Sequence, residues 1–234
     1  PSDVGLDIGG TVDLEKTTKI IEEDLGAGKA ISFWKALMIP GVIEFSIAQF
    51  FIKLVSYTFL YWLPLFLKET TQISPSKSAY VSIIFDIGGC VGSMAAGLMA
   101  DRTGTSALTC IFFLIFAIPS LYSLDRYTSA STILISQVLQ FTTGMLINGP
   151  FCLIMSTVSA NLACKVPSKS AMATVSGIVN GTGSIGASIG PLLAGIVSKN
   201  GNWKNVFYMA IGSVICAAIS LLRIGYQEVK TFKK

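Results

Sequence analysis

The sequence contains no histidine, and only 13% of its 234 residues are charged. The absence of histidine removes the side chain that most often serves as a metal ligand or general base. No combination of nucleophile and base and no pair of aspartates is visible, so an enzyme is not expected. No run rich in lysine and arginine occurs either, which argues against binding to nucleic acid.

Cysteine chemistry is equally sparse. The cysteines are odd in number and widely spaced, and no C-x-x-C pair occurs; they are Cys90, Cys110, Cys152, Cys164 and Cys216. A disulfide framework is therefore not expected, and we interpret the cysteines as small apolar packing residues. Without a cluster of ligand residues, neither a metal nor another cofactor is predicted.

Long apolar runs are what the sequence does contain. Hydrophobic residues make up 52% of the chain, with a mean hydropathy of +0.66. They form six blocks, approximately residues 40–67, 79–100, 107–124, 132–153, 171–197 and 206–224. A helix of about 20 residues crosses about 30 Å of hydrocarbon. We therefore predict an all-α membrane protein, with a polar linker over residues 1–30 and a bundle of six transmembrane helices over residues 31–234.

The distribution of positive charge orients these helices in the lipid bilayer. Six crossings place both ends of the bundle on the same side of the membrane. If that side is the cytosol, eleven lysines and arginines are cytosolic and five lie on the opposite side. The positive-inside rule then predicts a multi-pass protein in which both ends of this segment are cytosolic.

A single cation, Lys53, stands near the middle of the first block. A charge at that depth costs several kcal/mol and normally faces a bundle interior or a water-filled cavity. Gln49, Tyr57 and Tyr61 recur with Lys53 at every fourth residue, so all four share one side of a helix. This face predicts a path for an anionic solute, with Lys53, Tyr57 and Tyr61 as substrate-binding residues. Interfacial anchoring is the alternative role for the tyrosines.

Three further polar residues lie inside apolar blocks. Asp86 is expected either to pair with Lys53 or to bind a coupling proton. Asn148 and Asn180 are candidate substrate-binding residues, because an amide in hydrocarbon needs a partner. The surrounding sequences, Asn148-Gly149-Pro150 and Asn180-Gly181-Thr182-Gly183, are expected to break the fourth helix and to open the fifth. Simple helix packing is the alternative role for the glycines.

The second block ends in a recognisable polar turn. Gly97, Asp101, Arg102 and Gly104 match the loop signature of the major facilitator superfamily, G-x-L-a-D-r-x-G, which this stretch resembles. In that family the signature contributes gating contacts on the cytosolic side, and the resemblance carries this role to Asp101 and Arg102. The basic residues that commonly follow the signature are absent here.

Four longer stretches resemble the carboxyl-terminal half of sugar phosphate exchangers, the organophosphate:phosphate antiporters. They are GVIEFSIAQFFIKLVSYTFLYWLPLFL, FDIGGCVGSMAAGLMADRTG, INGPFCLIMSTVSANLA and ATVSGIVNGTGSIGASIGPLLAGIVS. The resemblance implies exchange of a sugar phosphate for inorganic phosphate by alternating access in the endoplasmic reticulum membrane. It also implies a missing amino-terminal half of six helices. The alternatives are a facilitator carrier for another organic anion and a solute channel.

One departure from these exchangers concerns the cation itself. In the related antiporters the substrate-binding cation lies five residues before an acid–Trp pair, and counting back from Tyr61-Trp62 gives Ser56. Lys53 stands almost one helical turn earlier. It is therefore expected either to bind phosphate from a shifted height or to form a structural ion pair.

Overall fold

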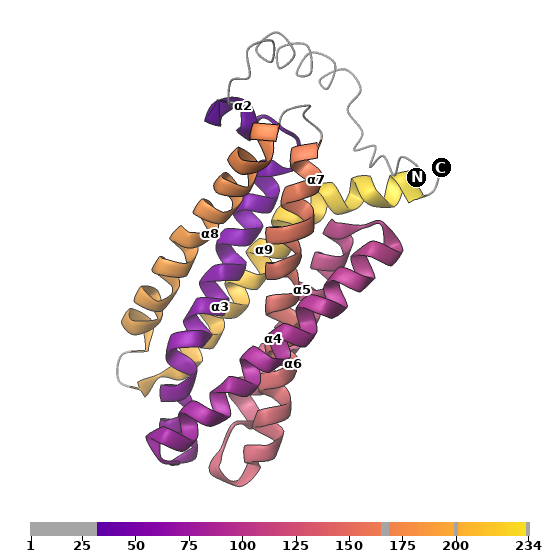
Figure 1. Cartoon of the computed structure of the whole chain (residues 1–234). Helices are drawn as coiled ribbons and strands as arrows, with labels where there is room; N and C mark the ends of the chain where they lie inside the picture. Colours follow the sequence, from indigo (N-terminus) through magenta and orange to yellow (C-terminus); the bar gives the residue numbers. More distant parts are fainter. Residues whose placement is uncertain (1–31, 165–168, 199–200, 233–234) are drawn as a thin grey trace.

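The computed structural model describes residues 32–164, 169–198 and 201–232, and these form helices joined by short turns (Figure 1). The predicted linker over residues 1–30 lies outside the described residues. The helices are α2 (Phe33–Leu37), α3 (Val42–Thr71), α4 (Pro75–Thr103), α5 (Ser106–Tyr127), η1 (Ala130–Thr132), α6 (Ile133–Leu153), η2 (Ile154–Val158), α7 (Ser159–Cys164), α8 (Lys169–Val197) and α9 (Trp203–Phe232).

Within the described ranges, five helical stretches are long and apolar enough to cross a membrane: α3, α4, α5, the stretch from η1 to α7, and α9. The predicted fifth span, α8, is not among these five. It is long enough, at 29 residues, and glycines, serines and Asn180 are interspersed with its aliphatic residues. It nevertheless lies along α3 over its length (Figure 1). The predicted helical membrane fold is confirmed.

Short turns fix the order of neighbouring helices. Between α3 and α4, Gln72 adopts a left-handed conformation (φ 57°), and the Ser74 side chain accepts a hydrogen bond from the Lys77 backbone N–H. Pro75 follows as the first residue of α4, where its missing N–H has no cost. Between α4 and α5, Gly104 has φ 66°, so the turn in the predicted loop signature does require glycine.

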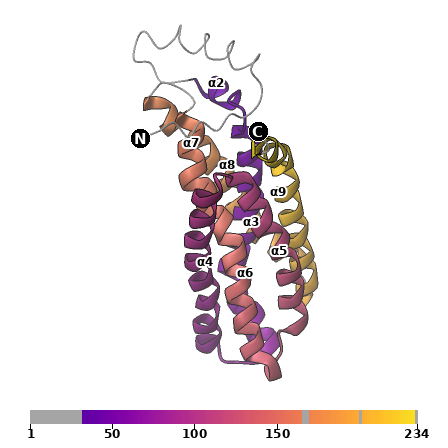
Figure 2. The same cartoon turned by 90° about the vertical axis from the view of Figure 1, so that its right-hand side faces the viewer.

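Glycines bring α4 and α6 into backbone contact, and the two helices run side by side in Figure 2. A Cβ added at Gly92 would lie 2.1 Å from the carbonyl oxygen of Met145. A Cβ added at Gly144 would lie 2.0 Å from that of Phe85. Any larger residue at these positions would force the two helices apart.

Glycines also bring α3 and α8 into backbone contact. A Cβ at Gly186 would lie 2.1 Å from the carbonyl oxygen of Phe50, and one at Gly190 would lie 2.4 Å from that of Leu54. Small residues allow membrane helices to approach this closely. We name the α4–α6 and α3–α8 contacts the two glycine seams of the bundle.

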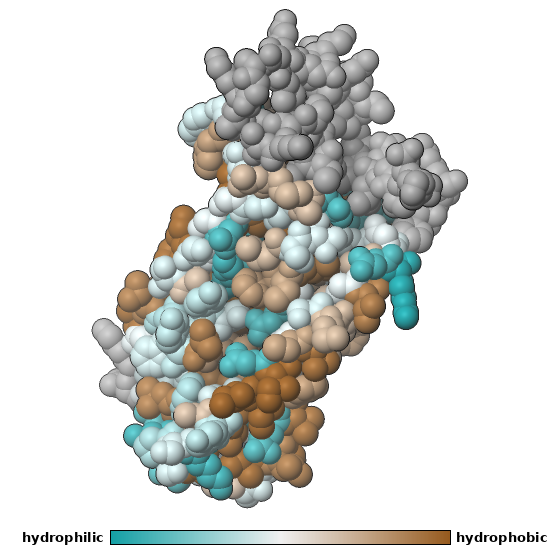
Figure 3. All heavy atoms as spheres, viewed as in Figure 1, coloured by the Kyte–Doolittle hydropathy of each residue, from teal (hydrophilic) through white to brown (hydrophobic). Residues whose placement is uncertain are grey.

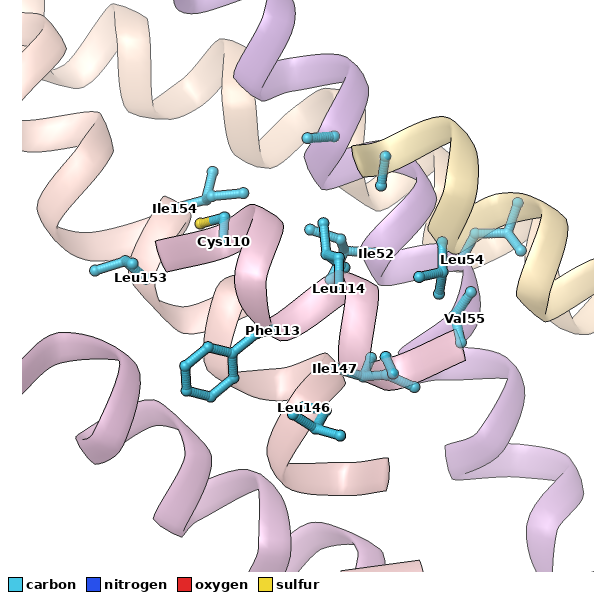
Figure 4. Close-up of a cluster of buried hydrophobic side chains, with 14 of the residues drawn as sticks. Ile52, Leu54, Val55, Cys110, Phe113, Leu114, Leu146, Ile147, Leu153 and Ile154 are labelled. Carbon is cyan, nitrogen blue, oxygen red and sulfur yellow. The ribbon is translucent and has the colours of Figure 1, made fainter. Parts of the chain in front are cut away.

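An apolar core fills the space between α3, α5 and α6 (Figure 4). Ile52, Leu114 and Ile147 are fully buried and come from these three helices in turn. The core leaves Lys53 on the side of α3 that faces α6 and α8. Helices α5 and α9 pack on each other, away from that side (Figure 2).

Two predicted helix interruptions are wrong. Helix α6 continues through Asn148, Gly149 and Pro150, and α8 runs without a break past Asn180. A helix inside a membrane keeps its own backbone hydrogen bonds because lipid offers no substitute. The irregularity instead follows Pro150 by one turn, where residues 154–158 form the π-helical turn η2.

Candidate anion-binding site

The site begins with the ammonium group of Lys53, which lies between α3, α6 and α8. The residue is 5% exposed. Its Nζ donates a hydrogen bond of 2.6 Å to Oδ1 of Asn180 on α8 and lies 5.5 Å from the ring centroid of Phe151 on α6. No carboxylate of the described residues lies within ion-pair distance of it, so the pairing with Asp86 that the sequence allowed is not formed. An ammonium has three donors, and the described part of the chain supplies one hydrogen-bond acceptor to it, Asn180 Oδ1.

The third glycine of the α3–α8 seam makes room for this side chain. A Cβ at Gly183 would lie 2.8 Å from Cδ of Lys53 and 2.9 Å from Cγ of Gln49. The lysine stem therefore passes directly over Gly183 to reach Asn180, which lies one turn earlier on α8. Replacement of this glycine would displace the lysine side chain and leave the helix backbone intact, since the contact is with flexible atoms.

Gln49 lies one turn below Lys53 and is fully buried. Its Nε2 donates to the backbone carbonyl of Phe151 over 3.4 Å, and its Oε1 has no partner among the described residues. A buried amide oxygen without a donor carries a cost of about 1–3 kcal/mol. The ammonium of Lys53 and this oxygen are therefore two neighbouring polar groups that the described helices leave incompletely satisfied.

A second polar contact joins α3 to α6. Ser56 Oγ donates a hydrogen bond of 2.6 Å to Oδ1 of Asn148. A Cβ at Gly89 would lie 2.6 Å from Nδ2 of Asn148, so this amide fits only because α4 has a glycine there. Ser56 is the position at which the related antiporters have their cation. It faces the same side of α3 as Lys53, so the serine and the lysine border one site.

Tyr57 and Tyr61 continue this side of α3 beyond Lys53. Tyr57 is half-buried and Tyr61 is 64% exposed, and their ring centroids are 6.5 Å apart. Neither hydroxyl has a hydrogen-bond partner in the part of the chain that the structure describes. Both hydroxyls are therefore available as donors, and the position of Tyr61 also suits an interfacial anchor.

The three residues assigned to gating and coupling are all exposed. Asp86 lies on α4 next to Phe85, whose ring stacks on Phe59 of α3 at 5.6 Å between centroids. Asp86 is therefore level with the part of α3 that follows Lys53. Asp101 and Arg102 occupy the last turn of α4, and among the described residues neither forms an ion pair.

Polar side chains gather on one face of the bundle. Figure 3 shows hydrophilic and pale residues in the middle of the face formed by α3, α4 and α8, with hydrophobic residues at its edges and in a band across its lower half. Asn180, Ser184 and Ser188 are exposed at successive turns of α8. A face of this kind in an otherwise apolar bundle suits a path for a polar solute better than contact with lipid tails.

Sequence reasoning missed two residues, Phe151 at this site and Glu228 at the start of α5. Phe151 lies in an apolar block without any polar signal, and only the packing of α6 on α3 places its ring near Lys53. Glu228 is 6% exposed, and its carboxylate accepts hydrogen bonds of 3.0 and 2.9 Å from the backbone N–H groups of Ala107 and Leu108. It therefore caps the first turn of α5, beside the loop signature. A lone glutamate near the end of an apolar block was the available signal.

The bundle of membrane-length helices with a polar face defines a class of protein. A family model described as Major Facilitator Superfamily matches residues 45–234, and the chain belongs to this superfamily. The predicted membership is thereby confirmed.

Individual relatives narrow the resemblance further. The chain is 41% identical to the glucose-6-phosphate exchanger SLC37A2 of Xenopus tropicalis over 98% of its own length and 48% of the relative's. It is 46% identical to the Mus musculus protein of the same name, over 88% and 41% of the two lengths. It is 42% identical to the putative glycerol-3-phosphate transporter 5 of Arabidopsis thaliana, over 87% and 42%. The chain thus spans less than half the length of these curated relatives, as expected for one half of a facilitator fold.

Proposed function

We propose that this chain is the carboxyl-terminal half of a secondary transporter that exchanges a phosphorylated sugar for inorganic phosphate. The observation that carries the proposal is Lys53, a buried ammonium at the centre of a membrane bundle without a carboxylate partner among the described residues. A cation in that position is costly unless an anion neutralises it, and a substrate phosphate is such an anion. The relatives named above are exchangers or transporters of sugar or glycerol phosphates by their names.

The proposed binding side consists of Lys53, Tyr57, Tyr61, Asn148 and Asn180. Lysine supplies attraction as a point charge, and the hydroxyl and amide groups add hydrogen bonds that orient the substrate. A second set of six helices would close the other side, and the two halves would rock around the site in alternating access. We place this transporter in the endoplasmic reticulum membrane, with both ends of this segment in the cytosol.

The remaining assigned residues take their proposed roles from their positions. Asp86 is exposed on α4 at the level of the site, where it can bind a coupling proton or meet a cation of the other half. Asp101 and Arg102 are exposed at the end of α4, where they can contact the other half as it closes on the cytosolic side.

Reconstitution of the full-length transporter in liposomes tests the exchange. With phosphate inside, labelled glucose 6-phosphate should enter, and without internal phosphate it should not. Uptake that is independent of the internal anion would identify a channel instead. Uptake of other organic anions in exchange, without glucose 6-phosphate, would identify a carrier of a different substrate.

Substitution of the lysine tests the site. Lys53→Ala should lower the rate of exchange about 30-fold or more, because it removes the charged partner of a partly desolvated anion. Ser188→Ala is the matched control, since Ser188 is exposed on the polar face and bonds only to the backbone of its own helix. Normal exchange by the lysine variant, at equal protein content, would remove Lys53 from the site.

A further inference from the structure

The partner of Lys53 is a neutral amide that stands on the exposed side of the ammonium. Asn180 is itself exposed, whereas Lys53 is 5% exposed, so Asn180 is the more accessible of the two partners from the open face. The hydrogen bond between them is short, at 2.6 Å from Nζ to Oδ1. Among the residues that the structure describes, the Phe151 ring is the other group that lies at the ammonium. An anion that arrives from the open face therefore meets Asn180 before it meets Lys53.

An amide oxygen and a phosphate oxygen compete for the same donor. Both accept an N–H hydrogen bond from the ammonium, but the phosphate oxygen carries negative charge, so its bond adds the attraction between opposite charges to the hydrogen bond. The lysine side chain has several rotatable bonds, and its stem crosses Gly183, where no side chain restricts it. The ammonium can thus change partners without any movement of the helix backbone.

We propose that Asn180 is an exchangeable ligand of Lys53 that occupies the position of a substrate phosphate oxygen while the site is empty. This inference rests on the proposed function and changes one part of it: Asn180 belongs to the binding side as the group that the substrate displaces from Lys53, and not as a group that orients the substrate. When the anion binds, the ammonium transfers from the Asn180 oxygen to a phosphate oxygen, and the bond between α3 and α8 is released. Asn180 keeps the cation hydrogen-bonded between transport steps, and it lowers the affinity for the anion by competing with it.

Equilibrium binding of inorganic phosphate to the full-length transporter tests the exchange of partners. Asn180→Ala should tighten phosphate binding about threefold to tenfold, because the competitor for Lys53 is gone. Asn180→Ser should do the same, since the shorter side chain does not reach Lys53. Asn180→Asp should weaken binding at least about tenfold, because a carboxylate competes more strongly and repels the anion.

Ser184→Ala is the control for these variants, since Ser184 is exposed one turn from Asn180 and its hydroxyl bonds to the Asn180 backbone carbonyl. It should bind phosphate as the unmodified protein does. Weaker phosphate binding in Asn180→Ala and Asn180→Ser would overturn the proposal and show that Asn180 is a direct ligand of the anion. Unchanged binding would also overturn it, because Asn180 would then have no effect on the affinity. Lys53→Gln separates this failure from failure of the proposed function: normal phosphate binding by that variant would overturn both.

Discussion

The two glycine seams of this bundle allow equally close helix contacts, but their glycines face different groups of the opposite helix. In the α4–α6 seam, Gly92 and Gly144 face backbone carbonyls of the opposite helix. In the α3–α8 seam, Gly186 faces a backbone carbonyl in the same way, whereas Gly183 faces the side chains of Lys53 and Gln49. The α4–α6 seam also accommodates a neutral polar side chain, because Gly89 makes room for the Asn148 amide. The α3–α8 seam differs in that it houses a charged side chain, Lys53, which lipid would exclude.

Along α8, the glycines that allow close packing on α3 are therefore distinct from the glycine that makes room for the side chain of Lys53. Gly186 and Gly190 hold α8 against α3, and Gly183, less than one turn before Gly186, leaves a slot beside the cation. Loss of a joining glycine should damage stability. Loss of the slot glycine should damage binding while the helices stay together. The following substitutions test this separation in the full-length protein.

The largest expected effect comes from the α4–α6 seam. Gly92→Ala places a methyl group where a Cβ would lie 2.1 Å from the Met145 carbonyl oxygen, so α4 and α6 must separate. We expect a loss of about 3 kcal/mol in unfolding free energy, measured by titration with a denaturing detergent. Gly97→Ala, in the same helix, is the control, because nothing lies within 4 Å of its Cβ position. Equal stability of the two variants would contradict the close seam.

The slot glycine should give an intermediate effect of a different kind. Gly183→Ala pushes on Cδ of Lys53 and Cγ of Gln49, which are flexible side-chain atoms. Phosphate affinity should fall about tenfold, equal to about 1.4 kcal/mol, with little change in unfolding free energy. Gly181→Ala, two residues away in open space, should change neither quantity. A large loss of stability without a loss of affinity would make Gly183 a joining glycine like the others.

The smallest effect is expected at the contact between Ser56 and Asn148, which borders both seams. Ser56→Ala removes a hydrogen bond of 2.6 Å between helices. Such bonds inside membranes contribute about 0.6 kcal/mol on average, so stability should fall by about that amount. Thr70→Ala is the control, since the Thr70 hydroxyl bonds to the backbone of its own helix. A loss above about 2 kcal/mol would show that this contact matters more than an ordinary interhelical bond.

The sequence predicted those parts of the molecule that depend on one helix at a time. The apolar blocks, the position of Lys53 inside the bundle and the shared side of Gln49, Lys53, Tyr57 and Tyr61 all follow from hydropathy and a 3.6-residue period. The turn at Gly104 followed from its local signature. The position of Asn148 and Asn180 in apolar blocks predicts that each amide needs a partner, and both have one.

The sequence could not predict what depends on two helices together. The partners of the amides, Lys53 and Ser56, are set by how α3 packs on α8 and α6. The glycine spacing in α8 did not distinguish Gly186 and Gly190, which touch α3, from Gly177 and Gly181, which face open space. The same spacing is compatible with either face of the helix, so only the packed structure separates them.

The π-helical turn at residues 154–158 affects how this stretch aligns with the sequences of homologues. Such a turn inserts one extra residue into an otherwise regular helix. Side chains beyond it are rotated by about 100° from where an uninterrupted helix would direct them. A homologue with a plain helix at this point would match both flanks with one residue fewer. A single-residue gap between Ile154 and Val158 is therefore a physical feature to look for when two such chains are aligned.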